Sequence, residues 1–157
     1  MKKTTVLVLH NIRSAQNVGA MFRTAEAGGV SKIYLSGYTP TPIDKFNRER
    51  KDISKSALGA EKYIAWEYFK TITPILKRLK KDGYFIVGVE QSKDSIDYKK
   101  VKPQGKNAIL MGNEVEGISK AVLRNCDTVA EIPMAGTKES LNVSVAFGIF
   151  LFRFLNL

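Results

Sequence analysis

The chain has 157 residues, of which 44% are hydrophobic and 25% are charged, and its formal net charge is +10. This composition predicts one globular domain with a sizeable core and excludes a disordered chain or a coiled coil. The excess of positive charge favours an acidic partner, with nucleic acid ahead of an anionic membrane surface.

The first part of the chain predicts a β-α-β unit. Residues 4–9 are β-rich and continuously apolar in their second half, as in a strand that is covered on both faces of a parallel sheet. Helical spacing follows over 18–27 and stops at Gly28-Gly29, and residues 31–36 predict a second strand. Residues 37–56 are rich in charges and helix breakers, so we expect a surface excursion with room for one short helix.

The second part alternates between strands and helices. Apolar spacing predicts a helix over 68–81, in which Pro74 is tolerated if the first turn begins near Ile72. A short strand or turn is expected at 63–66, and a polar connection at 90–104. The other expected elements are strands at 84–89, 107–111 and 128–132, and helices at 120–125 and 143–155. This order predicts an α/β domain with a mostly parallel sheet and helices on both faces.

The sequence predicts neither a targeting segment nor a function for cysteine. The longest apolar stretch, 145–152, falls far short of the roughly 20 residues that a spanning helix needs, and the apolar run at 6–9 is too short for a signal peptide. The only cysteine, Cys126, excludes an internal disulfide and a thiol cluster for zinc. We therefore predict a cytoplasmic protein with no membrane partner and no metal, in which Cys126 and His10 are structural.

Three polar loops follow predicted parallel strands, at the edge where α/β sheets bind ligands. They span 11–23, 112–117 and 134–142. None has the pattern of a phosphate-binding or dinucleotide-binding loop, which argues against a kinase, a nucleoside triphosphatase or an ordinary dinucleotide enzyme. With His10 as the only histidine and no Gly-x-Ser-x-Gly elbow, serine or cysteine nucleophile chemistry has no support either. The remaining Asn, Ser, Glu and Arg side chains suit the positioning of a polar ligand for transfer of an activated group.

Together, the three loops resemble the motifs of the SpoU family of RNA ribose 2′-O-methyltransferases, within the SPOUT superfamily. Asn17 precedes Arg23 by six residues, as in the first motif, and residues 112–117 match the second, Gly-x-Glu-x-x-Gly. Residues 132–134 with 140–146 are similar to the third. The resemblance covers nearly the whole chain. It implies S-adenosylmethionine as methyl donor, a homodimer with a shared site, and an α/β trefoil-knot (SPOUT) fold.

By resemblance to the family motifs, four residues are catalytic candidates: Arg23, Asn17, Glu114 and Asn142. The resemblance implies that Arg23 holds the RNA phosphate and the reactive ribose and assists loss of the 2′-hydroxyl proton. A guanidinium is a poor base, because its pKa is above about 12, so a phosphate or the dimer partner would have to help. Helical geometry puts Gly19 beside Arg23, where its missing side chain leaves room for the guanidinium. The alternative for Arg23 is a weak surface ion pair with Glu26.

The other candidates also have structural alternatives. Asn17 and Asn142 can cap helices, and Glu114 can order neighbouring backbone N–H groups. For the cofactor, the resemblance points to backbone groups at Val89, Gly112, Ile132 and Leu141, with a side chain from Ser140.

The apolar helix at 143–155 is expected to be buried between the core and a dimer partner, or else within one subunit. The basic segments at 77–81 and 99–106 are either solvated faces or phosphate contacts. We expect residues 1–157 to form one catalytic domain without a separate RNA-binding domain, which favours tRNA over ribosomal RNA as the substrate. The competing hypothesis is a non-catalytic RNA-binding module on the same fold.

Overall fold

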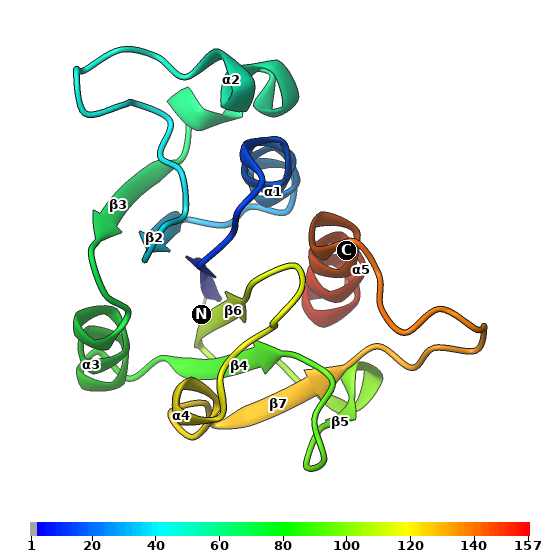
Figure 1. Cartoon of the computed structure of the whole chain (residues 1–157). Helices are drawn as coiled ribbons and strands as arrows, with labels where there is room; N and C mark the ends of the chain where they lie inside the picture. Colours follow the sequence, from blue (N-terminus) through cyan, green and yellow to red (C-terminus); the bar gives the residue numbers. More distant parts are fainter. Residues whose placement is uncertain (1–2) are drawn as a thin grey trace.

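A single parallel sheet organises the chain, whose computed structural model describes residues 3–157. Its strands lie in the order β3-β2-β1-β6-β4-β7-β5, and every pairing is parallel (Figure 1). The strands are β1 (Thr4–His10), β2 (Lys32–Ser36), β3 (Ala65–Phe69), β4 (Phe85–Val89), β5 (Ile96–Asp97), β6 (Lys106–Met111) and β7 (Thr128–Glu131). The helices are α1 (Ala15–Ala27), α2 (Lys51–Ala57), α3 (Thr73–Lys81), α4 (Lys120–Leu123) and α5 (Val143–Leu155), with short 3-10 turns η1 (Ala60–Lys62) and η2 (Tyr98–Lys100).

Helices cover both faces of this sheet, as predicted: α1, α2 and α5 lie on one side, and α3 and α4 on the other (Figure 1). The alternation of side chains along β1 separates two apolar clusters, with Leu7 and Leu9 in the first and Val6 and Val8 in the second. The first cluster also contains Phe147 of α5. Both faces of the central strands are therefore buried, which explains their continuous apolar sequence.

The boundaries of some elements differ from the predictions. The predicted helix at 68–81 is wrong in its first part, because residues 65–69 form β3 and pair with β2. Aromatic Tyr68 and Phe69 fit a strand as well as a helix, and α3 begins only at Thr73, with Pro74 in its first turn. The connection predicted at 90–104 also contains β5, which pairs with β7.

Helix α1 starts three residues earlier than the predicted position 18. Ser14 is the cause, since its side-chain oxygen accepts a hydrogen bond from the Asn17 N–H at 3.2 Å and caps the helix. The prediction that Gly19 makes room for Arg23 is wrong. A Cβ atom at Gly19 would overlap Ser56 Oγ and the carbonyl oxygen of Ile53, so the missing side chain allows α2 to pack against α1.

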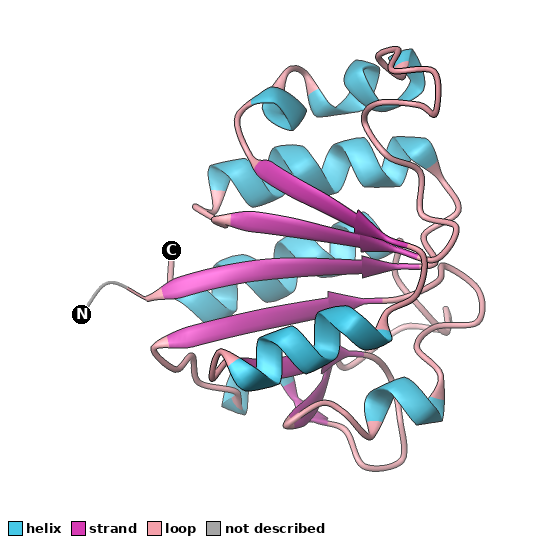
Figure 2. Ribbon diagram, turned by 90° about the vertical axis from the view of Figure 1, so that its left-hand side faces the viewer, coloured by secondary structure: helices cyan, strands magenta, loops and turns pink. Residues whose placement is uncertain are grey.

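The strands all point to one edge of the sheet, where the polar loops gather (Figure 2). None of the helices within residues 3–157 combines the length and the apolar character needed to cross a bilayer. The knotted path of the C-terminal segment stays a prediction from the resemblance.

Candidate active site

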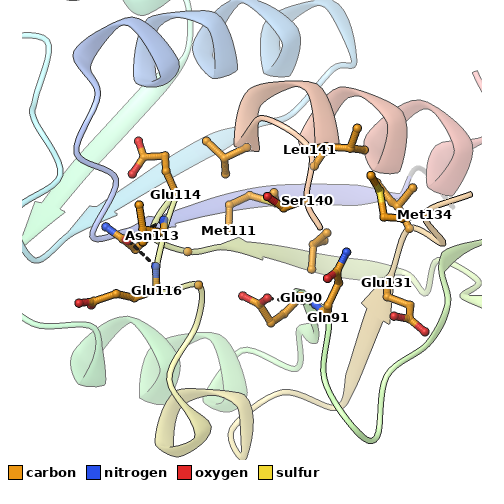
Figure 3. Close-up of a pocket in the computed structure, with 17 residues that line it drawn as sticks. Glu90, Gln91, Met111, Asn113, Glu114, Glu116, Glu131, Met134, Ser140 and Leu141 are labelled. Atoms are coloured by element: carbon orange, nitrogen blue, oxygen red, sulfur yellow. Dashed lines mark hydrogen bonds between the residues drawn. The ribbon is translucent and has the colours of Figure 1, made fainter. Parts of the chain in front are cut away.

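The three polar loops converge on one pocket at the carboxyl edge of the sheet. All five residues predicted for cofactor binding line it: Val89, Gly112, Ile132, Ser140 and Leu141. Figure 3 shows Leu141 and Ser140 on one wall, with Glu90 and Gln91 across from them. The pocket has a cavity volume of about 170 Å³ and is open to solvent. The carboxyl ends of parallel strands meet at this edge of the sheet, as expected. They bring together Val89 and Leu141, which are 52 positions apart in the sequence.

The wall formed by residues 134–141 has unused backbone groups. Within the described chain, these residues form no backbone hydrogen bond, although Met134, Ser140 and Leu141 line the pocket. Residues 135–140 are exposed to solvent, so their backbone N–H and C=O groups can exchange water for the edge of a bound heterocycle. Val89, Met111 and Val143 supply apolar surface to the same pocket. A flat ligand with a polar edge fits this combination.

Glu114 joins the second loop to the start of α1. Its carboxylate accepts hydrogen bonds from the backbone N–H groups of Arg13 at 2.9 Å and Ser14 at 3.0 Å, and from the Asn17 amide at 3.1 Å. Burial alone would raise the pKa of Glu114, but these hydrogen bonds outweigh it and hold the pKa below its ordinary value. The interpretation of Glu114 as a carboxylate that orders N–H groups therefore holds, and the group is ionised at neutral pH.

Asn142 links the third loop to the same junction. Its side-chain oxygen accepts hydrogen bonds from the Ser144 N–H at 2.9 Å and the Val145 N–H at 3.3 Å, so Asn142 caps α5 as one interpretation predicted. Its amide nitrogen donates to the side-chain oxygen of Asn17 at 3.2 Å. The capping interpretation of Asn17 is wrong, because Ser14 is the cap. The amide of Asn17 instead bridges Glu114 and Asn142, so the structure brings these three candidates together.

Arg23 stands apart from the other candidates. It is exposed on α1 and does not line the pocket, and it follows Asn17 by about 9 Å along the helix axis. The alternative of an ion pair with Glu26 is wrong, since no such pair forms among residues 3–157. Helical spacing puts Arg23 with Ala20 and Ala27 on the outer side of α1. This helix packs against α5, where a Cβ at Gly148 would lie 3.6 Å from Thr24 Cγ2.

Sequence reasoning missed several pocket residues. Glu90 and Gln91 line the pocket, and the position of Glu90 directly after a predicted strand was an available signal. Asn113 lies inside the second motif and folds that loop: its side-chain oxygen accepts from the N–H groups of Val115 at 2.9 Å and Glu116 at 2.7 Å. This role has a recognisable chemical basis, because Asn side chains form such turns readily.

Cys126 and His10 stay outside the site. Burial raises the pKa of the Cys126 thiol to about 11, which disfavours the nucleophilic thiolate. His10 Nδ1 lies 2.8 Å from Ser36 Oγ, and burial lowers its pKa. In the described part of the chain, no three His, Cys, Asp or Glu side chains form a group that could hold a metal.

The chain is also similar in sequence to known proteins. A sequence model of the SpoU rRNA Methylase family matches residues 4–152. The 23S rRNA (guanosine-2′-O-)-methyltransferase RlmB of Neisseria meningitidis is 35% identical over 146 residues, which cover 93% of this chain and 56% of that protein. The chain thus spans little more than half the length of such relatives.

Two solved structures resemble the fold closely. The AdoMet-bound rRNA methyltransferase of Sinorhizobium meliloti has a TM-score of 0.88 and 28% identity, and the match covers 98% of this chain and 56% of that one. The TrmH/SpoU tRNA modifying enzyme of A. aeolicus has a TM-score of 0.83 and 28% identity, with 99% of this chain and 75% of that one covered.

Proposed function

The chain belongs to the SpoU rRNA methylase family, and from this premise we propose that it transfers a methyl group from S-adenosylmethionine to a ribose 2′-hydroxyl of RNA. One observation carries the proposal: the pocket wall at 134–141 combines unused backbone groups with neighbouring apolar side chains. This donor and acceptor set fits an adenine edge without a distinctive sequence motif. The AdoMet-bound relative of Sinorhizobium meliloti supports the choice of cofactor.

The residues of the pocket hold and orient the reactants in this proposal. Val89, Ile132 and Leu141 would enclose the adenosyl part. Gly112 lets the second loop fold back on itself, because a Cβ there would lie 2.8 Å from the Gly117 backbone. The cofactor supplies an already activated methyl group, so the protein needs to position the acceptor rather than create a nucleophile from a side chain. The Glu114–Asn17–Asn142 junction fixes the three loops in this arrangement.

We propose that Arg23 binds an RNA phosphate near the reactive ribose, as the family resemblance implies. Since Arg23 lies outside the pocket of its own chain, it would serve the pocket of a second protomer. The competing hypothesis of a non-catalytic RNA-binding module does not explain why Asn17, Glu114 and Asn142 are joined beside a pocket of this kind. The cytoplasmic location stays a prediction.

The test is calorimetry with S-adenosylmethionine followed by transfer of a labelled methyl group. We expect a Kd of about 1 μM to 1 mM, which is the range of KM values common for enzymes. A matched control is Gly112→Ala, because the added Cβ would lie 2.8 Å from the Gly117 backbone and obstruct the second loop. No binding by the parent protein at millimolar cofactor would contradict the proposed activity.

The acceptor RNA needs a separate comparison. We propose tRNA as the first substrate and ribosomal RNA as the second. Both need testing, because the A. aeolicus relative is named for tRNA and the Neisseria meningitidis relative for 23S rRNA. Fractionated tRNA and deproteinised ribosomal RNA should be offered side by side to the same preparation. Label in the ribosomal fraction alone would reject the tRNA preference and leave the methyltransferase activity intact.

We also propose a homodimer in which α5 forms part of the interface. Val145, Ile149 and Phe152 recur at helical spacing on its outer face and are 50%, 38% and 39% exposed. An apolar stripe of this kind is typical of a surface that a partner covers.

Ile149→Glu should therefore convert the dimer into monomers, because the interface would have to bury a carboxylate. Analytical ultracentrifugation measures this change. Leu58→Glu is the matched control, since Leu58 is exposed at the end of α2. A parent protein that sediments as a monomer at micromolar concentration would contradict the proposed interface.

A further inference from the structure

We infer that a second hollow beside the cofactor pocket holds an unstacked nucleotide of the acceptor RNA, with its base on Tyr38 and its phosphate on Arg13. Arg13, Tyr38, Asn113, Val115 and Glu116 line this hollow. The inference rests on the proposed function and deepens it by naming the residues that receive the RNA.

The hollow and the cofactor pocket share a wall. Asn113, Val115 and Glu116 line both, and Figure 3 shows Glu116 at the end of the cofactor pocket that lies away from Met134. A nucleotide in the hollow would therefore touch the same loop that encloses the cofactor. A ribose acceptor needs this proximity, because methyl transfer requires the reacting atoms to lie about 3–3.5 Å apart.

Tyr38 is held in place although 55% of it is exposed. Its backbone N–H donates to Asn11 Oδ1 at 3.3 Å, and its hydroxyl oxygen accepts from Asn113 Nδ2 at 2.9 Å. Asn11 adopts a left-handed backbone conformation with φ 56°, and a Cβ at the neighbouring Gly37 would overlap its side chain. Because both its backbone and its hydroxyl are held by hydrogen bonds, the Tyr38 side chain loses little conformational entropy on binding. Such a ring is suited to stacking against a base.

Arg13 supplies the positive charge. Its backbone is fixed by the bond from its N–H to the Glu114 carboxylate, while its exposed side chain has no ion pair among residues 3–157. An unpaired guanidinium can bind a phosphate in bidentate fashion. Glu116 also lines the hollow and would repel a phosphate, so the RNA backbone should run beside Arg13 rather than beside Glu116.

The remaining wall is apolar. Val115 is 84% exposed at the tip of the second loop, and its N–H is bound to the Asn113 side chain. An exposed aromatic ring, an apolar side chain and one free arginine around a shallow hollow match the way proteins take up splayed nucleotides, by stacking plus phosphate contact.

The first experiment measures binding of a fluorescein-labelled, mixed-sequence single-stranded oligoribonucleotide by anisotropy, with the full chain saturated with S-adenosylmethionine. Tyr38→Ala should weaken binding by roughly 5- to 150-fold, the range for loss of one stacked base. Tyr38→Phe should retain most of the affinity, because it keeps the ring. Tyr63→Ala is the matched control, since Tyr63 is 83% exposed near the opposite edge of the sheet and should leave binding unchanged.

The second experiment follows the salt dependence of the same binding. Arg13→Gln should reduce the slope of log K against log salt by about 0.7, as expected for one lost contact to a single-stranded phosphate. Arg124→Gln, an exposed arginine after α4, is the control and should leave the slope unchanged.

Two results would overturn the inference. In the first, Tyr38→Ala binds the oligoribonucleotide as tightly as the parent does. In the second, Tyr38→Ala and Tyr38→Phe lose the same amount of RNA affinity, which would assign the effect to the hydroxyl bond with Asn113. Calorimetry with S-adenosylmethionine separates these outcomes from failure of the proposed function. Every variant should bind the cofactor like the parent, whereas a parent that fails to bind it contradicts the activity itself. Equal melting temperatures across the variants exclude unfolding as the cause.

Discussion

Replacing Arg23 with alanine should lower the rate of methyl transfer by about 10²- to 10³-fold, the usual cost of removing one electrostatic group that acts in the transition state. The affinity for S-adenosylmethionine should not change, because Arg23 does not line the pocket of its own chain. Arg23→Lys should recover only part of the rate, since it keeps the charge but loses the planar fork that binds a phosphate. Single-turnover transfer to the preferred RNA measures both changes.

If the chain forms the proposed homodimer, mixed dimers determine which protomer supplies Arg23. The Arg23→Ala chain keeps an intact pocket. The Gly112→Ala chain keeps its arginine, but the added Cβ would displace the second loop, which forms part of the pocket wall. If Arg23 serves the partner, co-refolding the two inactive variants should restore methyl transfer, because one complete site forms in each mixed dimer. A mixture that stays inactive would assign Arg23 to its own subunit, and an Arg23→Ala variant as fast as the parent would remove it from the reaction.

Glu114→Gln should affect both activity and stability. The substitution replaces a carboxylate that accepts from two backbone N–H groups and the Asn17 amide with a side chain that has one acceptor oxygen. We expect a loss of about 1 kcal/mol in the free energy of unfolding, because the group is partly exposed to solvent. Displacement of the second loop should slow methyl transfer roughly 10- to 100-fold. Urea denaturation and initial rates measure the two effects.

The stability effect of Glu114 should depend on pH. The folded state lowers the pKa of this carboxyl, so its contribution is complete above the unfolded value of about 4.3 and is lost as the pH falls through the lower, folded pKa. The difference between the parent and Glu114→Gln should therefore be largest near neutrality and shrink in acid. Glu116→Gln is the matched control on the same loop, and an equal effect there would contradict the role of the Glu114 hydrogen bonds.

The sequence was sufficient to predict the central architecture and the place of the pocket. Continuous apolar runs such as 6–9 and 108–111 indicate buried parallel strands, and the polar loops that follow such strands meet at one edge of the sheet. The two-residue β5 was missed because a strand of that length has no periodicity. The strand or turn expected at 63–66 overlaps the start of β3, but the end of β3 was assigned to a helix because Tyr68 and Phe69 fit both a strand and a helix.

The individual contacts of the site were less accessible to sequence reasoning. Ser14 and Asn17 are both good capping residues, and only the structure shows that Ser14 caps α1 and leaves the Asn17 amide to bridge two loops. Gly19 was misassigned for a related reason: an absent side chain does not indicate which neighbour occupies the space. Tyr38 gave no signal, because its anchoring depends on two asparagines from other loops.

The junction of Glu114, Asn17 and Asn142 has a consequence for the order of folding. Its hydrogen bonds connect residues that are 97 and 125 positions apart in the chain. Forming contacts between such distant residues requires the chain between them to lose conformational entropy. Folding is therefore slower than for a protein with mainly local contacts. We therefore expect the pocket to close only after the strands that carry these loops have paired, so partly folded chains should lack the cofactor site.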